Sequence, residues 1–158
     1  MATTLATITR ATLADASEIL ALQKLAYQSE AERYNDYAIP PLVQTLAEME
    51  DDLRGQVVIK ATLDGDLVGS ARAWEKDGTA FIGRVIVHPR WQGKGLGKQL
   101  MADLEARFPA ARRFELFTGH LSHRNLGFYR GLGYRDFKTV ALTPTIQFVY
   151  LEKTQAPQ

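Results

Sequence analysis

The stretch "RVIVHPRWQGKGLGKQLM", residues 84–101, joins a β-branched run to a helical pattern through a glycine-rich segment. Three glycines occupy alternate positions in it: Gly93, Gly95 and Gly97. Glycine at a strand-to-helix junction lets backbone N–H groups turn toward a ligand, and the positive N-terminal end of the helix points at the same place. The stretch therefore predicts an anion cradle, to which Lys94 and Lys98 add positive charge.

Two common phosphate motifs do not fit this glycine stretch. A Walker loop needs four residues between its glycines and then Lys and Ser or Thr, whereas three residues separate Gly93 from Gly97 and Gln99 follows Lys98. The dinucleotide fingerprint needs glycine three places after Gly95, where Lys98 stands. The residues alone thus leave two interpretations, a phosphate site of another kind or a glycine-rich turn.

The composition is that of an ordinary globular protein, with 158 residues, 46% hydrophobic and 23% charged. We expect one domain over 1–153 and a short polar tail over 154–158. The net charge of +1 offers no bulk attraction to nucleic acid or to an anionic membrane, so neither is expected as a partner. The chain begins without a signal-peptide pattern, which favours a cytoplasmic location.

The chain also lacks cysteine, and its three histidines have no metal-site spacing, so no metal is expected. These histidines, which we interpret as loop or cap residues, are His88, His120 and His123.

Hydrophobic periodicity predicts an α/β (α+β) fold with a mixed, mostly antiparallel sheet of six to seven strands and about four helices. The expected strands are "LATITRAT", "VVIKATL", "LVGSARAW", "TAFIGRVIV", "RRFELFTG", "YRDFKTV" and "TIQFVYLEK". Asp64-Gly65 and Asp77-Gly78 are strong signals for tight hairpins. A capping box of Thr12 and Asp15 opens the first helix, "QSEAERYNDYAIPP" reads as a loop, and Ser122 caps a short helix before the last two strands.

The run Gln92-Gly93-Lys94-Gly95-Leu96-Gly97 resembles the acetyl-coenzyme A loop of the GNAT superfamily of N-acetyltransferases. The segment "LGFYRGLGY" is similar to the tyrosine-bearing helix of that family, and the predicted order of elements over 5–153 is the family's order. The resemblance implies a GNAT-like acyl-CoA N-acyltransferase fold and an enzyme that uses acetyl-CoA as co-substrate.

The resemblance also implies where coenzyme A lies. Main-chain groups of the loop would hold its diphosphate: Gln92, Gly93, Lys94, Gly95, Leu96, Gly97 and Lys98. Main-chain atoms of Val85, Ile86 and Val87 would pair with the pantetheine arm, in a gap where this strand splays from "FELFTG". The family often has an asparagine seven residues before its tyrosine, where this chain has Ser122, and Asn125 follows one turn later. Both are candidates for a contact with coenzyme A.

Direct acetyl transfer needs a proton donor for the departing thiolate and a base for the amine. Tyr129 suits the first role, because a phenol with a pKa of about 10 stays protonated at neutral pH. An alkylamine with a pKa near 10.4 must lose its proton to a carboxylate or to a water chain that ends on one. The candidate bases are Glu30, Glu32, Glu75 and Glu115, of which Glu30 and Glu115 are retained.

The segment "QSEAERYNDYAIPP" combines acidic residues with tyrosines, a mixture that can attract and stack a cationic amine or can form a solvated connector. We expect Glu30, Glu32 and Tyr34 to contact the acceptor. The expected acceptor is a primary amine, small or peptide-like, acetylated by direct transfer in a ternary complex.

Two other classes of function remain. A non-catalytic acyl-CoA binding module would keep the glycine cradle without turnover. A nucleic-acid binder is weaker, because a cofactor with three phosphates explains the local basic residues at least as well. Short edge strands near the C-terminus permit a homodimer but do not require one.

Overall fold

The structure, a computed structural model, describes residues 5–156 of the chain. Seven strands form one sheet in the order β1-β2-β3-β4-β5-β7-β6, with neighbouring strands antiparallel except β4 and β5. The strands are β1 Thr7–Arg10, β2 Val57–Leu63, β3 Asp66–Lys76, β4 Thr79–Val87, β5 Arg113–Gly119, β6 Arg135–Ala141 and β7 Gln147–Thr154. The mixed, mostly antiparallel sheet expected from the sequence is confirmed.

The helices fall between these strands in the described part of the chain. They are α1 Ala16–Ala26, α2 Gln28–Tyr34, α3 Pro40–Val43, α4 Leu46–Gly55, α5 Leu96–Ala106 and α6 His123–Gly131, with 3-10 turns at Leu13–Asp15 and Pro89–Trp91. None of the helices within residues 5–156 combines the length and the apolar character that crossing a lipid bilayer requires.

Two tight hairpins build the first half of the sheet. Asp64 and Gly65 have φ of 50° and 84°, and Asp77 and Gly78 have φ of 53° and 81°. Left-handed conformations at both central residues match the right-handed twist of the flanking strands. The hairpins predicted from these two Asp-Gly pairs are therefore confirmed.

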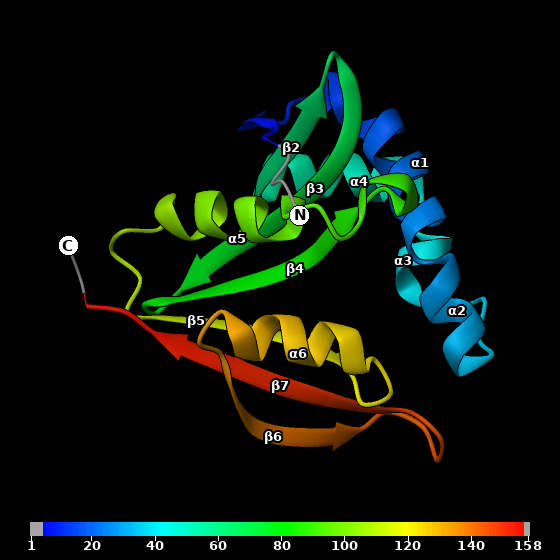
Figure 1. Ribbon diagram of the computed structural model, residues 1–158, viewed down its shortest axis with the longest axis vertical. Helices are drawn as coiled ribbons and strands as arrows, with labels where there is room; N and C mark the ends of the chain where they lie inside the picture. The colour runs from blue at the N-terminus through cyan, green and yellow to red at the C-terminus, as the bar shows by residue number, and fades with distance from the viewer. Residues whose placement is uncertain (1–4, 157–158) are drawn as a thin grey trace.

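The sheet opens between β4 and β5. The two strands pair only where Thr79–Phe81 lies beside Arg113–Glu115, and beyond that point they diverge, as Figure 1 shows. The register of β4 against β3 also shifts between Ser70 and Arg72, opposite Arg84, whose φ is 50°. Such a β-bulge bends a strand and increases its twist. The main chain of β4 after Phe81 is consequently left without β5 as a partner.

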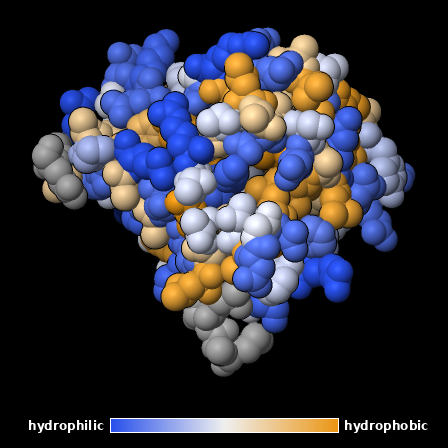
Figure 2. Space-filling view, turned by 90° about the horizontal axis from the view of Figure 1, so that it is seen from above, coloured by the Kyte–Doolittle hydropathy of each residue, from blue (hydrophilic) through white to orange (hydrophobic). Residues whose placement is uncertain are grey.

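Helices cover the two faces of the sheet unequally. Helices α5 and α6 lie over one face, α5 on the half formed by β2 to β4 and α6 on the half formed by β5 and β7 (Figure 1). The main core fills this side, and a smaller core lies under α1 and α4 on the other face of the first half. On that face of the second half, Phe117 remains 51% exposed. Hydrophobic and hydrophilic side chains are interspersed on the surface seen in Figure 2.

Two local expectations need correction, and the limits of the predicted tail stay a prediction. The segment predicted as a loop forms α2 and the start of α3. The sequence pattern missed α2 because Ala31 is its one buried residue, so that no apolar stripe marks the helix. Helix α3 begins with Pro40 in its first turn. Ser122 stands at the N-cap of α6, but its side chain makes no capping hydrogen bond. In the predicted tail, β7 extends to Thr154 and Gln155 donates to the Phe108 and Ala111 carbonyls, while residues 157–158 lie outside the described residues.

Candidate active site

The divergence of β4 and β5 opens a cleft of about 1090 Å³. Its walls come from β4, β5, the loop before α5, helix α6 and the segment around α2, so both halves of the sheet contribute. The predicted site residues that line it are Glu30, Tyr34, Val85, Ile86, Val87, Gln92, Gly93, Gly95, Leu96, Gly97, Lys98, Glu115, Ser122, Asn125 and Tyr129. The fold thus brings most of the predicted residues to one cavity.

The glycine loop has the conformation that its sequence requires. Gly93 and Gly95 have φ of 76° and 85°, which residues with a Cβ seldom adopt, and Gly95 is the N-cap of α5. The first turn of α5 has no preceding helical turn to accept its N–H groups, and these groups point out of the helix start. Gly97 lets Phe128 of α6 pack closely against α5, because a Cβ on residue 97 would lie 3.1 Å from Cζ of Phe128. This loop can hold a diphosphate.

Gln92 joins the glycine loop to both halves of the sheet. Its Nε2 donates to the Val87 carbonyl at 3.3 Å, and its Oε1 accepts from Nη1 of Arg124, at the start of α6, at 3.2 Å. Lys98 and Arg124 line the cleft at this end, whereas Lys94 does not. The basic groups at the mouth of the cleft therefore come from α5 and α6 together.

The strand β4 offers its main chain to the cleft. Ile86 and Val87 pair with Ser70 and Gly69 of β3 on one side, and the other side faces the gap. Unpaired N–H and C=O groups along a strand edge are ready to pair with an extended ligand. The geometry of this segment suits an arm with amide groups, such as pantetheine.

Tyr129 lies on α6 and is 9% exposed. Its ring makes edge contacts with Phe128 and Tyr134, at centroid distances of 5.1 and 6.1 Å. Burial raises the pKa of Tyr129 well above its ordinary value, and the nearby Tyr27 and Glu30 raise it further. The phenol is consequently neutral throughout the physiological range and can donate a hydrogen bond into the cleft.

A chain of hydrogen bonds fixes Glu30. The Leu121 N–H donates to the Tyr34 hydroxyl at 2.9 Å, Tyr34 and Ser122 share a hydrogen bond of 2.8 Å, and the Ser122 hydroxyl donates to Oε2 of Glu30 at 2.8 Å. Asn125 Nδ2 donates to Oε1 of Glu30 at 3.1 Å. This chain ties α2 to the beginning of α6, and it explains why the Ser122 hydroxyl does not cap its own helix.

Close packing at the end of β5 depends on Gly119. A Cβ on Gly119 would overlap the Tyr34 hydroxyl. Arg33 adds an ion pair of 3.1 Å to Oε1 of Glu30. Donors therefore surround the carboxylate of Glu30. One of them, Ser122, is buried, with an exposed fraction of 1%.

The other candidate carboxylates differ in position. Glu115 lines the cleft and pairs with Arg113 at 2.9 Å, while Arg113 also binds Glu152 at 2.8 Å. Glu32 and Glu75 are exposed and do not line the cleft. Residues 30, 33 and 34 of α2 line the cleft and residue 32 does not, so the expected acceptor contact of Glu32 stays a prediction without a place in this cleft.

The histidines lie outside any cluster of metal ligands. Nδ1 of His88 accepts from the Arg90 N–H at 3.1 Å, and Nδ1 of His120 accepts from the Gln147 N–H at 3.0 Å. Within residues 5–156, no group of three or more His, Cys, Asp or Glu side chains is placed to hold a metal ion.

Sequence reasoning missed several residues that line the cleft, among them Tyr27, Arg72 and Arg84. Arg72 and Arg84 lie on strands whose alternation of polar and apolar residues was visible in the sequence. A bulge between these strands changes which face of the sheet each side chain occupies. No signal in the sequence marked this bulge. Arg84 is a non-glycine residue with positive φ, which costs backbone energy and often marks functional sites.

The fold and the cleft are those of an N-acetyltransferase. The family model "Acetyltransferase (GNAT) family" matches residues 17–134, and the chain belongs to this family. The chain is 30% identical over 139 residues to aminoglycoside N(6')-acetyltransferase type 1 of Stenotrophomonas maltophilia, a match that covers 77% of this chain and 85% of that protein.

Solved structures with low sequence identity share the fold. The PaiA N-acetyltransferase of Thermoplasma acidophilum, solved in complex with coenzyme A, has a TM-score of 0.83 at 13% identity, covering 96% of this chain and 100% of that one. The ribosomal-protein-alanine N-acetyltransferase of Brucella melitensis has a TM-score of 0.74 at 21% identity, covering 94% and 99%. The mixed GNAT fold expected from the sequence is confirmed.

Proposed function

We propose that the protein transfers the acetyl group of acetyl-CoA directly to a primary amine on a small molecule, in a ternary complex. The observation that carries the proposal is the meeting of three features in one cleft: the glycine cradle, the open edge of β4 and the neutral phenol of Tyr129. The similarity to an aminoglycoside acetyltransferase supports a small-molecule amine.

In this proposal, the diphosphate of coenzyme A binds the main chain of residues 92–98, and its pantetheine arm pairs with the main chain of residues 85–87. Lys98 and Arg124 add charge at the mouth. Ser122 and Asn125 both stay candidates for a contact with coenzyme A: the Ser122 hydroxyl lies between Tyr34 and Glu30, and Nδ2 of Asn125 donates to Glu30 and Thr118.

The chemistry then needs two proton transfers. The amine nitrogen attacks the thioester carbonyl, a C–N bond forms, and the C–S bond breaks. Tyr129 donates to the sulfur as negative charge develops there, and the raised pKa keeps this donor protonated. The amine proton passes to Glu30, directly or through water, because Glu30 lines the cleft and contacts Asn125 on α6, the helix that carries Tyr129.

Binding of acetyl-CoA is tested with a matched pair of glycine variants. Gly95 and Gly65 have almost the same φ, 85° and 84°, but Gly65 lies in a hairpin turn outside the cleft. Aspartate tolerates left-handed φ, so Gly95→Asp and Gly65→Asp carry similar backbone strain, and only the first places a carboxylate in the cradle.

We expect acetyl-CoA at 100 times its Kd to stabilise the wild type and Gly65→Asp by about 2.7 kcal/mol, a rise in Tm of roughly 5–11 °C. Gly95→Asp should bind at least ~10-fold more weakly, as repulsion between like charges predicts. Thiol release during a screen of primary amines separates an enzyme from a non-catalytic acyl-CoA binding module. If acetyl-CoA does not stabilise the wild type, both the enzyme and the acyl-CoA binding module are contradicted.

The base is tested by Glu30→Gln and Glu115→Gln. If Glu30 accepts the amine proton, Glu30→Gln lowers kcat/KM by about 10²–10⁴-fold. Glu115→Gln is expected to change kcat/KM by less than about 10-fold. A fall in Tm for Glu30→Gln with an unchanged kcat/KM would instead assign Glu30 to holding α2 against α6.

The domain limits 1–153, the cytoplasmic location and the permitted homodimer stay predictions from the sequence.

A further inference from the structure

The side of the cleft opposite α5 and α6 contains a cation without an acidic partner. Arg84 lines the cleft, and no carboxylate among residues 5–156 lies within ion-pair distance of its guanidinium. The described groups that interact with it electrostatically include the Tyr27 hydroxyl and a second cation, Arg72. A guanidinium in a partly closed cleft without a counter-charge is positioned to attract an anion.

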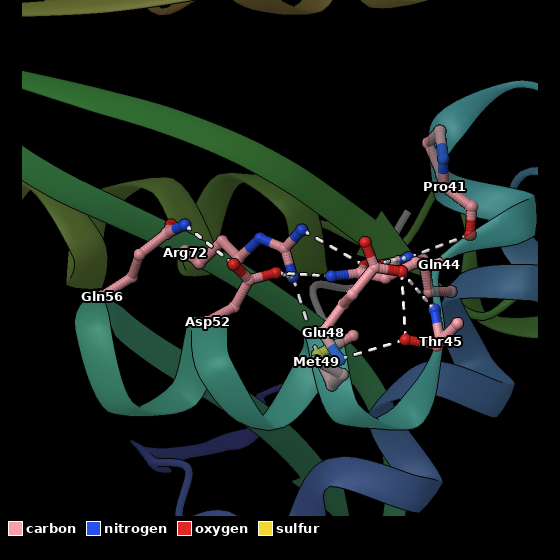
Figure 3. A network of polar contacts seen from close by, with 9 residues as sticks. Pro41, Gln44, Thr45, Glu48, Met49, Asp52, Gln56 and Arg72 are labelled. Atoms are coloured by element: carbon pink, nitrogen blue, oxygen red, sulfur yellow. Dashed lines mark hydrogen bonds and ion pairs between the residues drawn. The ribbon is translucent and has the colours of Figure 1, made fainter.

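Arg72 does not share this property, because the protein neutralises it. Figure 3 shows its guanidinium within a polar network from α4 and the segment before it. Nη1 of Arg72 pairs with Oδ2 of Asp52 at 3.1 Å, and Nη2 donates to Oε1 of Gln44 at 3.4 Å. Gln44 in turn donates to Asp52 at 2.5 Å. The charge of Arg72 is thus compensated internally, and that of Arg84 is not.

The backbone at Arg84 is held at an energetic cost. Arg84 lies in the bulge of β4 and has a φ of 50°, a left-handed value that glycine adopts easily and arginine does not. Strained positions persist only when the surrounding structure fixes them, and they concentrate at ligand-binding sites. The bulge moves the guanidinium to the same face as Arg72 and Tyr27.

Arg84 and Tyr129 line the same cleft. Tyr27 lies within electrostatic reach of both Arg84 and Tyr129. An anionic group bound to Arg84 would consequently share this cleft with the amine that attacks beside Tyr129. An α-amino carboxylate has this arrangement of charges.

The same side of the cleft is lined by aromatic rings. Trp74 and Phe81 stack at a centroid distance of 4.6 Å, and Phe117 contacts Phe148 and Tyr150 at 4.8 and 5.2 Å. All five line the cleft, and Trp74 and Phe117 are 43% and 51% exposed. Exposed rings that form one wall of a cavity favour an apolar or aromatic group on the ligand.

We infer that the acceptor is an amine with a carboxylate close to the amino group and an apolar side group, with Arg84 as the residue that binds the carboxylate. This inference names the substrate class and rests on the proposed function. It differs from the cationic acceptor that the acidic residues of the α2 segment suggested, because Arg33 compensates the charge of Glu30 and Glu32 does not line the cleft. The three described contacts of the Glu30 carboxylate leave it a lone-pair site for the amine proton.

A binding experiment tests the inference without requiring turnover. The probes are N-acetyl-L-phenylalanine, N-acetyl-L-phenylalaninamide and N-acetylphenethylamine, each titrated with saturating coenzyme A. We expect the carboxylate probe to bind about 10- to 100-fold more tightly than the other two, the range typical of one charged hydrogen-bonded contact. Arg84→Gln should remove this preference, Arg84→Lys should keep part of it, and the matched control Arg54→Gln, on the surface of α4, should retain it fully.

Turnover is measured with the corresponding free amines and with an aminoglycoside. Higher kcat/KM for L-phenylalanine than for phenethylamine, lost in Arg84→Gln through KM, supports the inference. Equal affinity for the three probes, a preference unchanged in Arg84→Gln, or an effect of Arg84→Gln on coenzyme A alone would overturn it. Turnover of cationic amines only would overturn the inference on the acceptor and leave the proposed function intact. Carboxylate-selective binding without any turnover would contradict the proposed function and leave the inference on Arg84 intact.

Discussion

Tyr129→Phe is expected to lower kcat by about 10²–10⁴-fold and to leave the Kd of acetyl-CoA within about threefold of the wild type. The substitution removes one hydroxyl from a side chain that is 9% exposed, and it keeps the ring contacts with Phe128 and Tyr134. The loss should appear in kcat rather than in acetyl-CoA affinity, because the proton is needed only as the thiolate leaves. Steady-state kinetics with the best amine, together with calorimetry for acetyl-CoA, measures both quantities.

Tyr134→Phe is the matched control. Tyr134 is 2% exposed, lies outside the cleft and donates to Oε2 of Glu105 at 2.7 Å, so this variant should lose stability and keep kcat. The pH profile gives a second readout. Since burial raises the pKa of Tyr129 above its ordinary value near 10, wild-type kcat should not decline up to about pH 10 through ionisation of this group. Full turnover by Tyr129→Phe would remove the phenol from the mechanism.

Asp52→Ala is expected to destabilise the protein by about 2–3 kcal/mol, or roughly 4–12 °C in Tm. The side chain of Arg72 is 7% exposed, and burial lowers its pKa to about 10 against the opposing effect of Asp52. Removal of Asp52 leaves this guanidinium buried without a counter-charge. The expected loss is below that of a fully buried pair, because the Asp52 side chain is 24% exposed.

The neighbouring aspartate supplies the control for this measurement. Asp51 pairs with Arg54 at 3.1 Å on the surface of α4, where the two side chains are 77% and 57% exposed. Asp51→Ala should change the free energy of unfolding by no more than about 0.5 kcal/mol. Urea denaturation of both variants measures the difference. Equal losses would mean that Arg72 does not depend on Asp52 for its burial.

The sequence by itself determined the features that depend on neighbouring residues. The two Asp-Gly hairpins follow from left-handed φ at adjacent positions, and the turn before α5 follows from glycine at 93 and 95. Fifteen of the residues predicted from the sequence or from the resemblance line one cleft in the structure.

Only the tertiary structure decided the chemistry on the acceptor side. Glu30 looked like an attractive anion in the sequence, but contacts to Ser122 and Asn125, more than 90 positions away, occupy its oxygens. In the sequence, Arg84 did not differ from other strand residues. In the structure it lies in the bulge of β4, and its side chain lines the cleft. Charge compensation and strand register both depend on partners distant in sequence. They are therefore settled by packing, which local patterns of residues do not encode.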